Sequence, residues 1–435
     1  MDVAVQAGLI LLVVFAFFLL IGTPIAFSII ISSVLTAVVI FPLNTSIIIA
    51  AQKAATGVDK LSLLAIPFFI LAGIIMNNGG IAVRLINFAK VMAGRIPGSL
   101  GQTNVVGNML FGAISGSAVA SAAAMGGILG PMQEKEGYDK TFSTTLNIAS
   151  APTGLLIPPS NVLITYSLVS GGTSVAALFM AGYLPGILWG LLTMLVGFII
   201  AKRNKYSISE KIPAKLKLKL FLDAIPSLML IVIVIGGITS GIFTATEGAA
   251  IAVVYALFLS MFVYRSLKVK DLPKILVETS KTTAIIMFLI AGSTIMSYVM
   301  TVAGIPQAIS ESIIGITDNP IAILLIINIL LLLVGTFMDM TPAILIFTPI
   351  LLPIAMQLGM DPVHFGIMIT MNLCIGSITP PVGNCLFIGC KVGNISIDKV
   401  IKPLIPYYFA IIIALLIVTF VPELSLWIPR LTGNL

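Results

Sequence analysis

Long apolar segments alternate with short polar stretches along the whole chain. A helix needs about 20 mostly apolar residues to cross a bilayer, and most of these segments reach that length. The pattern therefore predicts an all-α polytopic membrane protein. The segments are residues 3–21, 24–41, 62–79, 98–131, 141–168 and 175–201 in the first half, and 222–241, 246–264, 283–302, 320–356, 363–391 and 404–422 in the second.

Two of these segments, 98–131 and 320–356, are too long for one crossing. Each has small or helix-breaking residues near its centre, at 115–117 in the first and at 335–342 in the second. We interpret both as re-entrant helical hairpins whose tips end inside the protein. The alternative is two ordinary crossings joined by a short turn.

The two halves share spaced motifs. Six positions in the first half recur in the second half with the same residue type, at one constant spacing and without a gap, which indicates an internal repeat. The pairs are Pro131 and Pro353, Gly137 and Gly359, Asp139 and Asp361, Gly154 and Gly376, Pro158 and Pro380, and Pro159 and Pro381.

Each half breaks one apolar segment with the pattern Gly-x-x-x-Pro-Pro, which begins at Gly154 and at Gly376. Proline removes a backbone donor and clashes with the preceding turn, so a Pro-Pro pair interrupts a helix. Freed backbone groups at membrane depth must be buried in protein or line an aqueous site. Broken helices at corresponding places in two repeats are a pointer to the substrate and ion site of a transporter.

The positive charges predict the orientation in the membrane. With each hairpin returning to its own side, each half crosses five times, and an odd number makes the two repeats inverted. The basic 202–219 linker should be cytoplasmic. Counting from it puts both termini in the periplasm and the other basic clusters in the cytoplasm. These clusters are Arg84, Lys90 and Arg95; Arg265, Lys268, Lys270 and Lys274; and Lys391, Lys399 and Lys402.

The hairpins and broken helices are expected to form a mobile transport domain against a scaffold. Segments 44–58 and 81–95 mix apolar and charged residues, and they lie along the membrane surface or are polar loops. The predicted division assigns 1–96, 171–201, 220–304 and 396–435 to the scaffold, 97–170 and 305–395 to the transport domain, and 202–219 to the linker.

Composition narrows the function. The chain is 59% hydrophobic and 9% charged, with a net charge of +7 that comes from the basic loops. We therefore expect lipids around it and no nucleic-acid partner. A P-loop, paired carboxylates and a Ser–His arrangement are all missing from the sequence, so we expect no enzyme. His364 is expected in an exterior loop or at a helix end, and Cys374, Cys385 and Cys390 as free, packed thiols.

The first hairpin tip and the first break offer hydroxyls, carbonyls and an amide, but no carboxylate. Such oxygens suit Na⁺, which unwound carbonyls and helix ends bind in transporters, and suit a divalent metal poorly. Helix N-termini at the tips can meet an organic anion. The predicted Na⁺ ligands are Ser115, Ser117, Gly154 and Ile157, and the predicted substrate contacts are Ser115, Ser160 and Asn161.

By the repeat, the second tip and break form a second Na⁺ site. Asp339 lies well inside an apolar segment, where a carboxylate is a functional candidate. Alternatively, it is exposed at a wet tip and caps the hairpin. Glu247 is similar or merely sits at a helix start. The residues predicted for this site are Gly335, Thr336, Asp339, Gly376, Thr379 and Gly383.

Over essentially its whole length the chain resembles the large membrane subunit of the TRAP (tripartite ATP-independent periplasmic) transporters, and within them most of all the sialic-acid branch. The motifs that carry the resemblance are SGSAVAS at 115–121, PTGLLIPPSN at 152–161, GTFMDMTPA at 335–343 and TPPVGN at 379–384. The resemblance implies an elevator mechanism driven by Na⁺ in the bacterial inner membrane. It also implies a small four-helix membrane subunit and a periplasmic substrate-binding protein as partners.

Two other transport functions stay open. A stand-alone sodium/carboxylate symporter would take up its substrate without a binding protein. A channel would need a continuous polar pore, against which the paired occluding hairpins argue.

Overall fold

The computed structural model describes residues 3–93, 96–206, 213–317 and 319–435, and all regular structure in these ranges is helical. Nine of the described helices are long and apolar enough to cross a membrane. Many large apolar side chains on them are exposed, as lipid contact requires, and Leu12 and Val13 are examples. The predicted all-α polytopic fold is confirmed. Arg95 and the 207–212 part of the basic linker lie outside the described residues.

The first repeat runs from the N-terminus to the linker. Its helices are α1 (Val3–Leu20), α2 (Ile25–Ile40), α3 (Leu43–Val58), the short η1 (Leu61–Leu64), α4 (Ala65–Asn78), α5 (Ile81–Ala93), α6 (Ser99–Ser115), α7 (Ala118–Lys135), α8 (Lys140–Ser150), α9 (Thr153–Leu156), α10 (Asn161–Val169) and α11 (Val175–Arg203).

The second repeat runs from the linker to the C-terminus. Its helices are α12 (Ala214–Thr239), α13 (Ala245–Phe258) with η2 (Leu259–Val263), η3 (Val269–Asp271), α14 (Leu272–Ala303), α15 (Ile305–Ile316), α16 (Pro320–Phe337), α17 (Met340–Gln357), α18 (Pro362–Gly376), α19 (Asn384–Gly393), α20 (Ile397–Phe420) and α21 (Glu423–Leu431). Both Pro-Pro bonds, 158–159 and 380–381, are cis.

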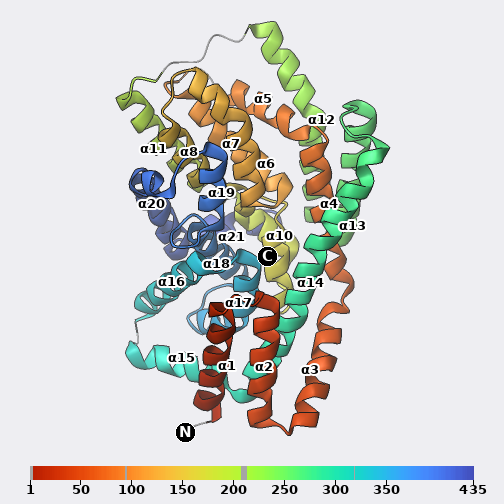
Figure 1. The fold of residues 1–435 in the computed structure, drawn as a ribbon, viewed down its shortest axis with the longest axis vertical. Coiled ribbons are helices and arrows are strands. Elements are labelled where there is room, and N and C mark those ends of the chain that lie inside the picture. Colours follow the sequence, from red (N-terminus) through yellow and green to blue (C-terminus); the bar gives the residue numbers. More distant parts are fainter. Residues whose placement is uncertain (1–2, 94–95, 207–212, 318) are drawn as a thin grey trace.

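The two hairpins enter the molecule from opposite ends (Figure 1). The first is α6 and α7, which comes from the end that carries the basic linker. The second is α16 and α17, which comes from the end that carries α15 and the start of α1. This opposite entry is the inverted arrangement expected from five crossings in each half.

The 43–58 segment corrects one expectation. It is neither a surface helix nor a loop, because α3 packs along α14 and α2. Together with η1 and α4 it forms a bent arm that corresponds to the single long helix α14 of the second repeat (Figure 1). The 81–93 segment is the amphipathic helix α5, whose buried face packs on α6 and α12, so its reading as a loop is wrong.

One close backbone contact holds each hairpin on its own broken helix. A Cβ at Gly154 would lie 2.3 Å from the Cα atom of Gly112, and one at Gly376 would lie 2.3 Å from the carbonyl carbon of Gly335. The two contacts are equivalent by the repeat, because each glycine of the first pair recurs in the second pair at the repeat spacing, to within a single position. Only glycine permits such an approach, so these positions fix where each hairpin meets its break.

The helices form two bodies. One contains α1 to α4, α13 and α14, which pack mainly on one another and which α12 joins through α13, and the other contains the hairpins and the broken helices. Helix α11 packs on α6, α9 and α18, and helix α20 packs on α8 and α18. The expected assignment of 171–201 and 396–435 to the scaffold is therefore at odds with their packing, which joins them to the hairpin body. A last short helix, α21, packs on α11 and was not expected.

The Gly335–Gly376 contact gives a stability prediction. We expect Gly376→Ala to lower the unfolding midpoint of the purified protein by several degrees, because overpacking of this kind costs about 2 kcal/mol. Gly236→Ala in α12 is the control, since nothing lies within 4 Å of a Cβ placed there. Equal midpoints for the two variants would show that the contact is not as close as described.

Candidate functional site

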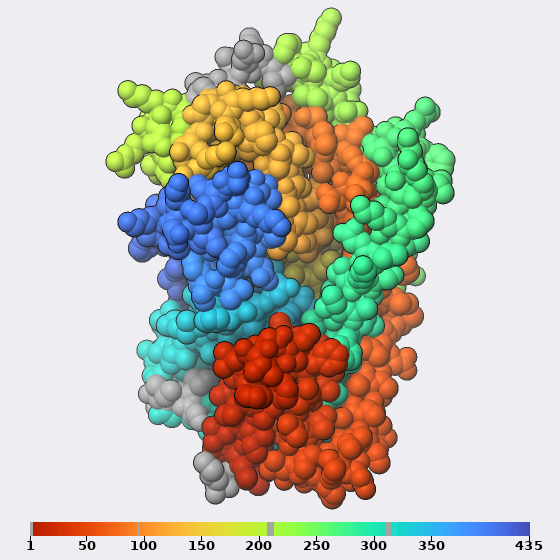
Figure 2. All heavy atoms as spheres, viewed as in Figure 1, coloured from red at the N-terminus to blue at the C-terminus, as the bar shows by residue number. Residues whose placement is uncertain are grey.

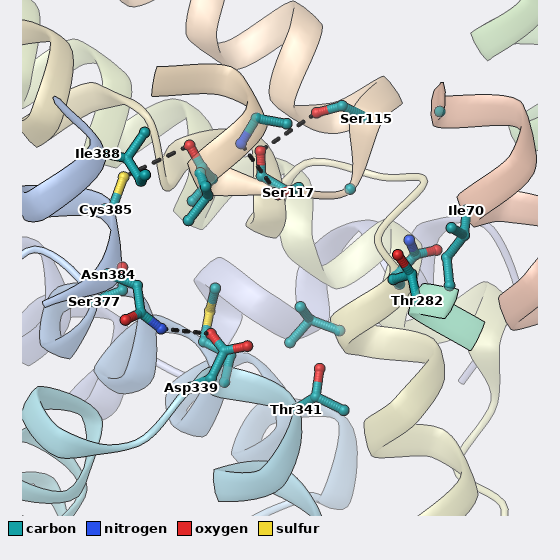
Figure 3. Close-up of a pocket in the computed structure, with 18 of the residues that line it drawn as sticks. Ile70, Ser115, Ser117, Thr282, Asp339, Thr341, Ser377, Asn384, Cys385 and Ile388 are labelled. Atoms are coloured by element: carbon teal, nitrogen blue, oxygen red, sulfur yellow. Dashed lines mark hydrogen bonds between the residues drawn. The ribbon is translucent and has the colours of Figure 1, made fainter. Parts of the chain in front are cut away.

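A cavity of about 630 Å³ lies where the two hairpin tips face α4 and α14. The hollow is visible in Figure 2 between the first hairpin and α14, and Figure 3 shows its lining. Because tips that enter from opposite ends line one cavity, both hairpins end inside the protein, as predicted. The polar residues that line it are Asn77, Ser115, Ser117, Asn161, Glu278, Thr282, Asp339, Thr341, Ser377 and Asn384.

The first tip is a tight turn between α6 and α7. Gly116 forms it with φ at +61°, and a Cβ on it would lie 2.6 Å from Nδ2 of Asn161 at the start of α10. The Ser117 hydroxyl accepts a hydrogen bond of 3.2 Å from the amide of Ala120 and so caps α7. The tip therefore rests on the helix that follows the break, and Ser115, Ser117 and Asn161 are brought together at the cavity.

Three residues predicted for the first site lie behind the cavity wall. Ser160 is fully buried, and its hydroxyl donates a 2.5 Å hydrogen bond to the carbonyl of Leu155. Gly154 is buried against Gly112, and Ile157 is close to Gly186 of α11. These residues form the break itself and do not line the cavity.

The second tip carries Asp339. Its carboxylate is exposed and accepts a 3.4 Å hydrogen bond from Nδ2 of Asn384 (Figure 3). Asp339 occupies the cap position of α17 but makes no side-chain capping bond. The carboxylate thus lies at a wet tip and faces the second break rather than the start of its own helix.

The remaining residues of the second prediction gather at the break. The amide of Gly383 donates to the carbonyl of Thr336 at 3.3 Å, which joins the tip to the break. The Thr379 hydroxyl donates to the carbonyl of Ile375 at 2.7 Å. Gly335 and Gly376 are buried in their mutual contact. The residues predicted for the second site therefore lie next to one another, although only Asp339 among them lines the cavity.

Four helices point their N-terminal ends at the cavity. Their first residues, Ala118 of α7, Asn161 of α10, Met340 of α17 and Asn384 of α19, all line it. The first N–H groups of a helix lack partners within that helix, and its N-terminus carries a partial positive charge. Such ends favour an anion. The cavity can therefore receive negative charge without a basic side chain.

The charged side chains that line the cavity are both acidic. They are Asp339 at the second tip and Glu278 on α14, and the described residues of the lining include no Lys, Arg or His. The described part of the chain also contains no cluster of three or more His, Cys, Asp or Glu residues that could hold a divalent metal. An anion in this cavity therefore meets helix ends and hydroxyls, together with two carboxylates that favour an accompanying cation.

Several lining residues were missed from the sequence. Asn384 was not among them, because its place in the second Pro-Pro motif predicts that it faces the second tip; it follows Asn161 at one position more than the repeat spacing. The same offset joins Gly112 to Gly335. Asn77, Glu278 and Thr282 come from helices outside the hairpin body and gave no signal, because single polar residues on long helices are common.

Residues outside the cavity settle three smaller expectations. His364 is buried near the start of α18, with Nε2 3.2 Å from the carbonyl of Thr419, so the expected helix end is confirmed and the exterior loop is wrong. Glu247 forms a capping box with Thr244, which confirms that it sits at a helix start. The three cysteines are free and buried, as predicted.

The comparison with known proteins identifies the chain. The family model described as "Tripartite ATP-independent periplasmic transporter, DctM component" matches residues 12–424. The chain belongs to this family. It is a multi-pass membrane protein of a secondary transport system for organic acids, as the resemblance implied.

Relatives along the whole length agree with this family. The chain is 55% identical to the uncharacterized protein YgiK of Salmonella typhimurium, over 96% of each chain. It is 39% identical to the sialic acid TRAP transporter large permease protein SiaM of Vibrio cholerae, over 94% of this chain and 95% of that protein. The fold is also similar to that of the Alcanivorax borkumensis YdaH transporter, with a TM-score of 0.63 at 13% identity over 88% of this chain and 87% of that one.

The turn at Gly116 gives a prediction about the site. Gly116→Ala should reduce substrate uptake at least about tenfold, because its Cβ would displace Asn161 and a positive φ disfavours a side chain. Gly137→Ala is the matched control, with φ at +82° but nothing within 4 Å of its Cβ. Uptake by Gly116→Ala equal to that of the control would contradict a functional contact between tip and break.

Proposed function

We propose that this chain is the large membrane subunit of a TRAP transporter that carries an organic acid anion together with Na⁺ across the bacterial inner membrane. The observation that carries the proposal is the convergence of four helix N-termini on one cavity between two hairpin tips. In transporters with inverted repeats, such helix ends point at the anionic group of the substrate. The cavity thus suits a carboxylate better than a neutral or cationic molecule.

The cavity's charge supports Na⁺ as the coupling ion. An anion would lie beside Asp339 and Glu278 with no basic side chain to compensate. A monovalent cation bound at each break would supply that charge, and hydroxyl and carbonyl oxygens are the ligands such ions take there. Two Na⁺ with one monovalent anion move one net charge, which gains about 2.3 kcal/mol from ~100 mV of membrane potential.

The ligands can be assigned as part of this proposal. Substrate contacts Ser115 and Asn161 at the first tip, and reaches Ser160 once that hydroxyl leaves the carbonyl of Leu155. The first Na⁺ binds among Ser115, Ser117, Gly154 and Ile157. The second binds among Gly335, Thr336, Asp339, Gly376, Thr379 and Gly383, where backbone groups of tip and break already meet.

The two bodies support an elevator mechanism. The hairpin body, with α11 and α20 included, would slide along the faces of α4 and α14 that line the cavity. The bent arm formed by α3, η1 and α4 and the long helix α14 would stay fixed. Substrate would then cross the membrane inside the moving body, beneath the two tips.

The partners are proposed from the family, and the orientation from the basic linker. As the large component of a tripartite system, the chain would work with a small four-helix membrane subunit and a periplasmic binding protein. The end with the basic linker would face the cytoplasm, and both termini the periplasm. Sialic acid is the first substrate to test, because of the relationship to SiaM.

Uptake into proteoliposomes tests this function. Purified chain is reconstituted with and without the two partner components, and labelled sialic acid, dicarboxylates and other organic acids are offered with and without Na⁺. We expect uptake of an acid that needs Na⁺, rises with an inside-negative potential and requires the binding protein. Full uptake driven by a proton gradient alone, without Na⁺, would sink the sodium assignment, and uptake without a binding protein would favour a stand-alone symporter.

Ser115 gives a direct test of the substrate site. Ser115→Ala should reduce uptake strongly, by about tenfold or more, without loss of folding, because it removes a hydroxyl at the tip where four helix ends meet. Ser240→Ala, in the exposed turn after α12, is the control. Wild-type uptake by well-expressed Ser115→Ala protein would count against this placement.

A substitution at Thr379 distinguishes binding of the ion from binding of the substrate. Thr379→Val keeps the shape of the side chain but removes a hydroxyl beside the second break. The Na⁺ concentration for half-maximal uptake should rise several-fold, and more than the corresponding substrate concentration. A rise in the substrate concentration alone would place the second ion elsewhere.

A further inference from the structure

A second, smaller cavity of about 140 Å³ lies between α7, α8 and α19, away from the one described above. It is at the end of the molecule that carries the linker, because Tyr138 at its rim stacks on Tyr206 at the start of that linker, with ring centroids 4.7 Å apart. Lys140 and Glu134 also line it, and they pair with each other at 3.4 Å. Its rim thus carries no net charge from this pair.

Three deeply buried polar side chains line this cavity with an atom that lacks a partner. The atoms are Nδ2 of Asn104, Oε1 of Gln133 and the hydroxyl of Ser143. The two amides are oriented by bonds elsewhere: Asn104 Oδ1 accepts from Asn108 at 2.8 Å, and Gln133 Nε2 donates to the carbonyl of Leu100 at 3.1 Å. One donor, one acceptor and one hydroxyl thus lie without a partner in the wall of this cavity.

Such groups require a partner. A buried polar group without a hydrogen bond costs roughly 1–3 kcal/mol, and ordered water is the usual remedy. At ~30 Å³ for each water, the cavity has room for roughly four. Its lining is built for water or for a hydrated ion rather than for an apolar ligand.

A buried polar chain leads from this cavity toward the first break. The amide nitrogen of Asn108 lies 2.8 Å from Oδ1 of Asn104, 3.1 Å from Oδ1 of Asn147 and 2.8 Å from the hydroxyl of Ser150. The carbonyl of Ser150 then accepts from the hydroxyl of Thr153, the residue before Gly154. Hydrogen-bonded polar groups thus continue from the cavity to the break, by way of the amide nitrogen of Asn108 and the backbone carbonyl of Ser150.

The other repeat closes the equivalent space. Thr144 and Gly389 line the cavity, and their counterparts at the repeat spacing, to within a single position, are Gly366 and Tyr166. There the ring of Tyr166 lies 2.5 Å from where a Cβ of Gly366 would be, and Tyr166 is fully buried. At these positions the described part of the second repeat is filled by an aromatic ring, whereas the first repeat lines a cavity.

We propose that this cavity is a water-filled recess through which a monovalent cation passes between the linker side and the first break. The proposal rests on the proposed function, since it supplies a path for the ion assigned to that break. Its route is separate from the hairpin tip, so the ion need not leave past the substrate.

Cysteine labelling tests whether the recess holds water. In reconstituted protein, Ser143→Cys should react with a small cationic methanethiosulfonate, although Ser143 is only 7% exposed. Thr145→Cys, buried on the same helix but not on the cavity, should stay unmodified, and the wild type with its three buried cysteines gives the background. Equal reactivity of the two variants would overturn the proposal.

A larger side chain placed in the recess tests whether the ion passes through it. Gly130 lines the cavity with nothing within 4 Å of its Cβ, so Gly130→Val should fill the space, slow labelling of Ser143→Cys at least tenfold and lower Na⁺-coupled turnover several-fold. Gly127→Val, equally open but off the cavity, should change neither. Equal turnover in the two Gly variants would overturn the route. Wild-type uptake without Na⁺ would instead overturn the proposed function, and labelling alone would then decide whether the recess is open to water.

Discussion

A broken helix at membrane depth must have its freed backbone groups covered by protein, and the rest of this structure depends on how that cover is made. Each break lies against its own hairpin through a pair of glycines, Gly112 with Gly154 and Gly335 with Gly376. No side chain separates the two backbones at these points. Once the hairpins are fixed in this way, their tips can stop inside the protein and face a shared cavity.

The same glycine contacts also determine the electrostatics of the cavity. Stopping each hairpin in the middle of the protein creates one helix start at its tip, and each break creates another on the far side of its Pro-Pro pair. The four starts meet because the repeats enter from opposite ends. An anion-favouring cavity thus follows from chain geometry, and the acidic residues Asp339 and Glu278 modify it rather than create it.

Much of this could be predicted from the sequence, because Pro-Pro breaks, overlong apolar segments and a fixed spacing are local signals. Ser115, Ser117, Asn161 and Asp339 were found in this way. The scaffold side of the cavity was not predicted, since nothing in the spacing of Glu278 says which helix α14 faces. The bent arm before α5 and the packing of α11 and α20 on the hairpin body were missed for the same reason: both depend on contacts between distant segments.

The two halves are also interlocked. Helix α7 of the first repeat packs on α19 of the second, and α17 of the second packs on α10 of the first. Part of each hairpin is therefore covered by the other half, and a single half would need a second copy to cover that part. Fusion into one chain released the two copies from identity. Tyr166 could then fill the space beside Gly366, whereas Gly389, its counterpart to within one position, lines a cavity. A symmetric pair of identical chains could not encode this difference between the two halves.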